Sequence, residues 1–94
     1  MAFAYNPFHA NMDVLMEIDS AIRVGVSGDS VYLTKEKLSE YYDKIKDEIN
    51  LASEVWLELD IQDFYAASDS YHDINVRLHE LKKTIKNLKF KLAA

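Results

Sequence analysis

The sequence predicts an all-α protein: an antiparallel, coiled-coil-like helical hairpin preceded by a shorter N-terminal helix, in a three-helix arrangement. Two stretches share one heptad spacing, with apolar residues recurring alternately every three and four positions, which is typical of helices that pack against each other. The 94 residues include only two glycines and one proline, and 49% are hydrophobic. This composition indicates a helical globular chain rather than a disordered or loop-rich one. We expect a single helical domain over residues 1–94.

The first helix is predicted over residues 7–24. Asn6 followed by Pro7 is a favourable start, because asparagine caps free amide groups and proline at the first helical position loses no hydrogen bond. Apolar residues then recur every three or four positions and predict one buried face: Phe8, Met12, Leu15, Ile18 and Ile22. Gly25 is a natural stop for this helix.

Residues 25–33 hold the concentrated turn signal of the chain, with Gly25 and Gly28 among small polar residues between two short apolar stretches. A short β-ribbon between the first two helices is one reading of this pattern. Because arms of about three residues would be marginal on their own, we rank the ribbon below a plain loop.

The second helix is predicted over residues 34–59. The Thr34 hydroxyl can cap its first turn, and Leu33 and Leu38 can meet across the cap as a hydrophobic staple. The heptad positions of this helix are all apolar: Leu38, Tyr42, Ile45, Ile49, Ala52, Trp56 and Leu59. This stripe predicts one continuous packing seam.

The third helix is predicted over residues 61–92. Its heptad positions are Phe64, Ala67, Tyr71, Ile74, Leu78, Leu81, Ile85, Leu88 and Leu92. This stripe is one residue out of phase with that of the second helix, so we place a chain reversal near Asp60, which can cap a new helix. One continuous helix with a skip, or a later break at residues 68–70, also fits the spacing.

Charge is distributed unevenly along the chain, whose net charge is -5. From Arg77 onward there are six basic residues and one acidic residue, whereas residues 1–76 carry a net charge of -10. The acidic residues cluster around the predicted hairpin turn. We expect this polarity to orient subunits, with the basic tail of one against the acidic turn of its neighbour.

Part of the apolar surface is expected to need a partner, because the first helix is too short to cover the third. A second apolar row on the second helix adds to that surface. The residues predicted to contact an oligomer or partner are Tyr41, Leu51, Val55, Leu57, Glu54, Glu58, Lys82, Lys86, Lys89, Phe90 and Leu92. We therefore expect a homo-oligomer or a protein partner, and a non-catalytic interaction or assembly subunit that acts through helical packing and charge-polarised self-association.

Two other functions fit the same charge pattern. The first is a small acidic inhibitor or sequestering protein that occupies a partner's basic or ligand site. The second is a nucleic-acid-associated factor, because Lys82, Lys86 and Lys89 lie on one helical stripe and could follow a phosphate backbone. The acidic total charge argues against nucleic acid as the partner.

No pattern in the sequence predicts an enzyme, a cofactor or a metal site. Asp69, His72 and His79 are too loosely spaced for a metal site, and without cysteine there is no disulfide or thiolate ligand. No run of eighteen apolar residues predicts a membrane span, and the N-terminus lacks the basic residues of a secretion signal. A cytoplasmic protein is expected.

One short segment carries a resemblance to a known family. Asp63-Phe64-Tyr65-Ala66-Ala67-Ser68-Asp69 resembles a segment of the small helical modulators of bacterial nucleoid-structuring proteins. The resemblance covers residues 63–69 alone. We carry over no function and no residue role from it.

Overall fold

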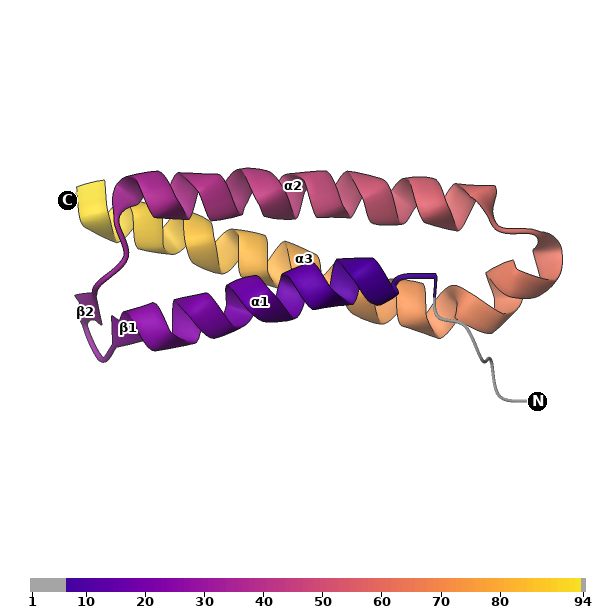
Figure 1. Cartoon of the computed structure of the whole chain (residues 1–94), viewed down its shortest axis with the longest axis horizontal. Helices are drawn as coiled ribbons and strands as arrows, with labels where there is room; N and C mark the ends of the chain where they lie inside the picture. The colour runs from indigo at the N-terminus through magenta and orange to yellow at the C-terminus, as the bar shows by residue number, and fades with distance from the viewer. Residues whose placement is uncertain (1–6, 94) are drawn as a thin grey trace.

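The protein is an elongated bundle of three helices, seen here in a computed structural model that describes residues 7–93. The helices are α1 (His9–Gly25), α2 (Lys35–Glu58) and α3 (Ile61–Ala93), and a ribbon of β1 (Val26–Ser27) and β2 (Ser30–Val31) joins the first two (Figure 1). The bundle measures 48 × 21 × 15 Å. The predicted all-α architecture, a helical hairpin with a shorter first helix, is confirmed.

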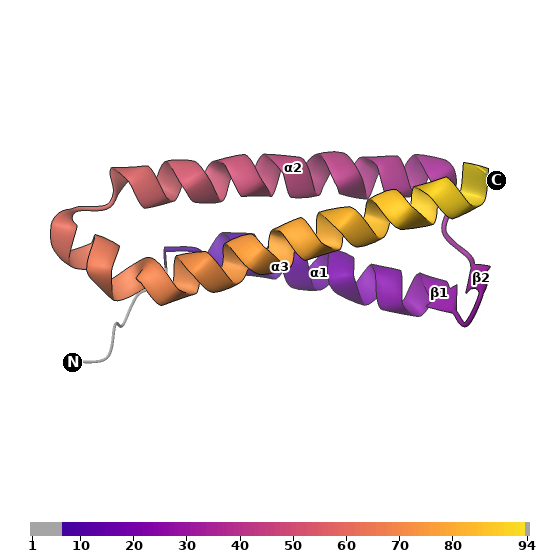
Figure 2. The same ribbon diagram turned by 180° about the vertical axis from the view of Figure 1, so that it is seen from behind.

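The hairpin is formed by α2 and α3, which run antiparallel side by side along the long axis (Figures 1 and 2). The chain reverses at Leu59 and Asp60. The Asp60 carboxylate accepts a hydrogen bond from the Asp63 backbone N–H at 2.9 Å, and its carbonyl accepts one from the Phe64 N–H at 2.7 Å. The predicted reversal near residue 60 is therefore correct, and α3 continues without a break through residues 68–70.

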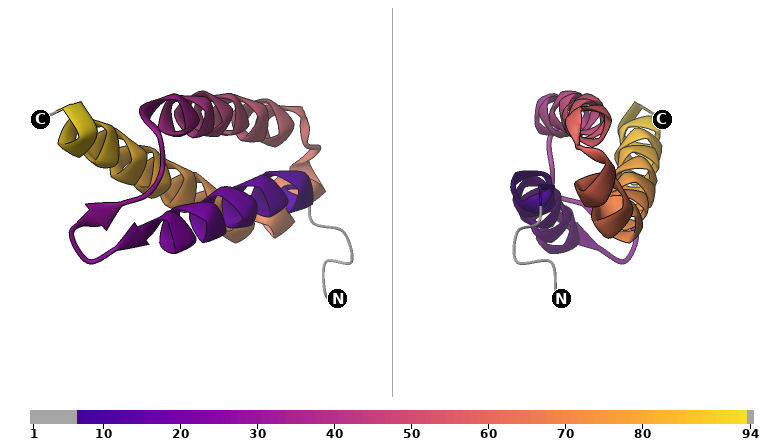
Figure 3. Two further views of the ribbon diagram at one scale, coloured as in Figure 1. Left: turned by 60° about the vertical axis from the view of Figure 1, so that its left-hand side comes forward. Right: turned by 90° about the vertical axis from the view of Figure 1, so that its right-hand side faces the viewer.

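The shorter helix α1 lies along one side of this hairpin (Figure 3). Its first hydrogen bond joins the Met12 N–H to the Phe8 carbonyl at 2.9 Å, and Phe8 caps the helix without a side-chain bond. The predicted Asn6 cap lies outside the described residues. Pro7 lies in the turn before the helix, so α1 begins at His9, two residues later than predicted.

A polar contact fixes α1 against α2. Asn11 is the one buried polar residue of the described chain, and its side-chain amide donates to the Glu48 carboxylate at 2.5 Å and to the Glu48 carbonyl at 3.4 Å. Since a buried amide without partners is costly, this pair favours one placement of α1 along the hairpin.

The segment between α1 and α2 is a tight ribbon rather than the plain loop that we ranked first. Val26 pairs with Val31 and Ser27 with Ser30. Gly28 has a φ of 59°, which fits the two-residue turn that closes such a hairpin. The ribbon forms because Val26 and Val31 also pack partly against the core, which supplies the burial that its short arms lack.

Helix α2 begins with the predicted Thr34 cap. The Thr34 hydroxyl accepts a hydrogen bond from the Lys37 N–H at 3.1 Å. Leu33, before the cap, is half-buried and lies so close to Gly25 that a methyl group on that glycine would be 2.5 Å from Leu33 Cγ. Helix α1 ends at Gly25, where the absence of a side chain leaves room for Leu33, and the φ angle of this glycine is not positive.

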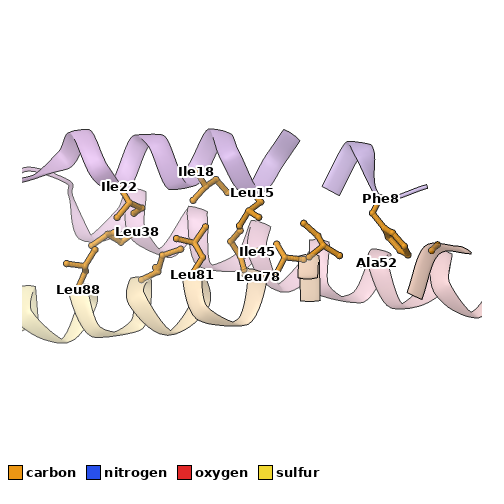
Figure 4. Packing of buried hydrophobic residues seen from close by; sticks show 13 residues of the cluster. Phe8, Leu15, Ile18, Ile22, Leu38, Ile45, Ala52, Leu78, Leu81 and Leu88 are labelled. Carbon is orange, nitrogen blue, oxygen red and sulfur yellow. The ribbon is translucent and has the colours of Figure 1, made fainter. Parts of the chain in front are cut away.

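The core follows the two predicted seams and one face of α1 (Figure 4). Its buried residues are Phe8, Leu15, Ile18, Ile22, Leu38, Ile45, Ala52, Ala67, Ile74, Leu78, Leu81, Ile85 and Leu88. Leu92 departs from the pattern because it is 38% exposed. The reason is that α3 extends past the start of α2, so the last turn of α3 has less to pack against (Figure 1).

Candidate interaction surfaces

Four side chains converge where the start of α2 meets the end of α3. The Nζ atoms of Lys46 and Lys82 each lie 5.8 Å from the centre of the Tyr42 ring, and that of Lys89 lies 5.3 Å from it. Tyr42 occupies a heptad position of α2, yet it is only half-buried. The negative face of an aromatic ring attracts cations, so Tyr42 gathers lysines from both helices.

A cleft of about 320 Å³ opens beside Tyr42. Its lining residues are Lys35, Tyr42, Lys86, Lys89, Phe90 and Ala93. Phe90 is 75% exposed. We call Tyr42 and the surrounding Lys35, Lys46, Lys82, Lys86 and Lys89 the Tyr42 lysine cluster.

No lysine of the Tyr42 lysine cluster forms an ion pair within 4.0 Å among the described residues, and the acidic residues interspersed with its lysines on α2 are Glu36, Glu40 and Asp43. The ion pairs within 4.0 Å in the described chain join His9 to Asp13, Arg23 to Asp19, Lys37 to Glu40 and Arg77 to Asp73. None of them involves a lysine of the cluster. This end of the bundle therefore presents concentrated positive charge to its surroundings.

The opposite end of the hairpin is acidic. Residues 47–76, which contain the reversal, include eight acidic residues and no lysine or arginine. Three large apolar side chains next to the reversal are largely exposed: Leu57 at 77%, Ile61 at 76% and Tyr65 at 74%. We call these three, together with Glu54, Glu58, Asp60 and Asp63, the acidic tip.

A cluster of stacked aromatic rings packs next to the acidic tip. The rings of Trp56 and Tyr71 lie nearly parallel with their centres 4.6 Å apart, and the centres of Trp56 and Phe64 are 3.9 Å apart. Phe8, before α1, adds a further ring at 5.4 Å from Tyr71. Because these rings come from both helices of the hairpin and from the segment before α1, they brace the tip against all of them.

The residues of the second apolar row on α2 differ in burial: two are half-buried and two are exposed. Tyr41 and Val55 are half-buried and pack against the core, so the single chain covers much of their surface itself. They are each seven residues from Glu48, the residue that bonds Asn11 of α1, and so lie on the same flank. Leu51, by contrast, is 47% exposed, and Leu57 belongs to the acidic tip.

The remaining predicted contact residues fall at the two ends. Glu54 and Glu58 are exposed at the acidic tip. Lys82, Lys86 and Lys89 belong to the Tyr42 lysine cluster, with Phe90 at its cleft and Leu92 on the following turn. The predicted contact residues omit other participants in these surfaces, among them Lys35, Tyr42, Lys46, Ile61 and Tyr65.

A second cleft, also of about 320 Å³, lies between α1 and α3. Its charged lining includes Asp19, Arg23 and Arg77. Asp19 pairs with Arg23 at 2.9 Å, and Arg77 pairs with Asp73 at 3.9 Å. Because opposite charges are already paired there, this cleft presents less net charge than the Tyr42 lysine cluster.

These features define a class by structure: a three-helix bundle whose two ends carry opposite charge. No family model matches the chain, and no curated protein or solved structure matches it either. Among the described residues, none of the helices has the length and apolar character needed to cross a membrane. The same residues contain no group of three or more potential metal ligands.

Proposed function

We propose that the protein is a non-catalytic interaction and assembly subunit, in which the Tyr42 lysine cluster of one copy docks on the acidic tip of the next. The observation that carries this proposal is that the lysines of the cluster lack an ion-pair partner among the described residues. The carboxylates of the acidic tip equally lack a basic partner there. Each end therefore offers the charge that the other end needs.

The separation of the two ends makes such pairing intermolecular. Most of the lysine cluster lies near the start of α2 and the end of α3, and Lys46 lies at the middle of α2, whereas the acidic tip lies at the other end of a bundle that is 48 Å long (Figure 1). Charges in salt solution are screened over about 8 Å at physiological ionic strength. The two ends of one chain thus cannot neutralise each other, whereas the ends of two chains can meet directly.

Exposed apolar side chains at both ends support the same pairing. Leu57, Ile61 and Tyr65 stand among the carboxylates, and Phe90 and Leu92 stand beside the lysines. Charge complementarity sets the orientation and speed of association and contributes an attraction that salt weakens, and burial of these side chains adds to the affinity. Because the two surfaces differ, the contact is heterologous and would build rings or open chains of subunits.

Charge reversal tests this proposal. One variant carries Lys82→Glu, Lys86→Glu and Lys89→Glu, and a second carries Glu54→Lys and Glu58→Lys. We expect each variant alone to have a lower mass by light scattering than the unmodified protein at the same concentration, because like charges then face each other. Mixing the two variants should restore assembly, since every cluster again meets a tip of opposite charge.

A matched control separates the specific contact from total charge. Lys44→Glu, Lys83→Glu and Lys91→Glu change the net charge by as much as the cluster variant, but at exposed lysines outside the cluster. This control should assemble more strongly than the cluster variant, and circular dichroism should show equal helix content in all of them. An equal loss of mass in control and cluster variants, or a mixture that stays dissociated, would contradict the proposal.

A further inference from the structure

The cleft beside Tyr42 has the size of a small-ligand site. Its volume of about 320 Å³ lies at the lower end of the range for small-molecule sites, about 300–1,000 Å³.

The charges around the cleft favour an anion with several negative groups. Lys35, Lys86 and Lys89 line it from two helices, and Lys46 and Lys82 lie beside the adjoining Tyr42 ring. Lysine binds phosphate as a compact point charge. Five lysine residues in and beside one cleft match the charge of a polyphosphate better than that of a single carboxylate.

An aromatic surface stands at the same cleft. Phe90 lines it, is 75% exposed, and forms none of the ring pairs found among the described residues. An exposed aromatic ring beside lysines is the arrangement on which proteins stack nucleobases while holding phosphates. The Tyr42 ring serves differently, because lysines already surround it.

We propose that this cleft binds a nucleoside polyphosphate, with the phosphates among Lys35, Lys86 and Lys89 and the base stacked on Phe90. If the acidic tip of a neighbour docks on the cluster as proposed above, the bound phosphates would use the lysines that this tip needs. The nucleotide and the neighbouring subunit would then each weaken the binding of the other. The cleft would then couple assembly to the supply of nucleotide.

Calorimetric titration of the full chain tests the site. The protein is kept dilute enough to be monomeric by light scattering, so that the result does not depend on assembly. The probes are adenosine triphosphate, inorganic tripolyphosphate and adenosine. We expect adenosine triphosphate to bind most tightly, tripolyphosphate more weakly, and adenosine not measurably. Absence of binding by adenosine triphosphate at millimolar concentration would overturn the proposal.

Two variants assign the binding to the cleft. Lys86→Glu with Lys89→Glu should weaken binding of adenosine triphosphate by at least about tenfold, because charged hydrogen bonds are lost. Phe90→Ala should weaken adenosine triphosphate but leave tripolyphosphate unchanged. The control pair Lys44→Glu with Lys91→Glu should retain most of the affinity. Equal losses in the cluster pair and the control pair would refute a specific site.

Two further measurements distinguish a mononucleotide from a nucleic-acid strand and test whether nucleotide binding affects assembly. A short single-stranded oligonucleotide that binds much more tightly than adenosine triphosphate would make a nucleic-acid strand the occupant and overturn the assignment to a mononucleotide. If the nucleotide binds at the cleft, adding it to concentrated protein should lower the mass measured by light scattering. An unchanged mass of an assembled protein would refute the coupling while leaving the site in place.

Discussion

Replacing Gly25 with alanine should destabilise the protein, although the residue ends a helix in which alanine is normally favoured. A methyl group at this position would lie 2.5 Å from Leu33 Cγ and 2.8 Å from each of the two Leu33 methyl carbons. These distances are far inside van der Waals contact. Because the φ angle of Gly25 is not positive, the predicted loss comes from packing and not from backbone strain.

The size of the effect follows from two opposing contributions. Alanine in place of glycine within a helix stabilises by about 1 kcal/mol. Forcing an extra methyl group into a filled space costs about 1–3 kcal/mol. Leu33 is half-buried against the core, so it has to move away from its packed position. We expect a net loss of about 1 kcal/mol, which lowers the melting temperature of a domain of this size by about 4–8 °C.

The assay is urea unfolding followed by circular dichroism, carried out in two backgrounds. In the unmodified protein, Gly25→Ala should lower the free energy of unfolding. In a Leu33→Ala background the new methyl group has room, so the same change should raise that free energy by up to about 1 kcal/mol. A Gly25→Ala change that stabilises both backgrounds equally would refute the close packing of Leu33 on Gly25.

Two further predictions concern the hairpin. Ile45→Ala should reduce the free energy of unfolding in urea by about 2–5 kcal/mol, because the side chain is fully buried, whereas Leu51→Ala, at a residue that is 47% exposed, should cost under about 1 kcal/mol. Similar losses at both positions would contradict the assignment of the core face of α2. Asp60→Ala should cost about 0.5–2 kcal/mol in thermal unfolding because the Asp63 N–H loses its acceptor, while Asp60→Asn should retain most of the stability. Equal losses in these two variants would show that the cap is not the cause.

The hairpin was predictable because its signals are local. The heptad stripes of residues 34–59 and 61–92 each point to one buried face. The slip in phase between Leu59 and Phe64 favours a reversal near Asp60, but it also fits a continuous helix with a skip or a break at residues 68–70, and the structure decides among them. The sequence favours a plain loop over the ribbon at residues 25–33, because contacts within the ribbon alone are too few to stabilise it. The ribbon depends on the packing of Val26 and Val31 on the rest of the bundle, which no local pattern reports.

The candidate surfaces were predictable in part. The charge pattern located both ends and the lysine stripe of the third helix, whereas the predicted contact residues did not include Lys35 and Lys46 of the second helix. The heptad spacing places Tyr42 in the packing seam of the second helix. Heptad spacing alone does not show which seam positions another helix covers and which stay partly open to solvent, as Tyr42 does. Ile61 and Tyr65 carried a usable signal, since they are large apolar residues beside the turn and off the stripe.

The most direct test of the central claim is the molar mass of the unmodified protein over a range of concentrations at low and high salt. Pairing between the Tyr42 lysine cluster and the acidic tip predicts a mass that rises with concentration at about 0.05 M salt. That mass should fall toward that of one chain at about 1 M salt, where screening acts over about 3 Å. A single-chain mass at every concentration in low salt, or an assembly that high salt leaves unchanged, would contradict the claim.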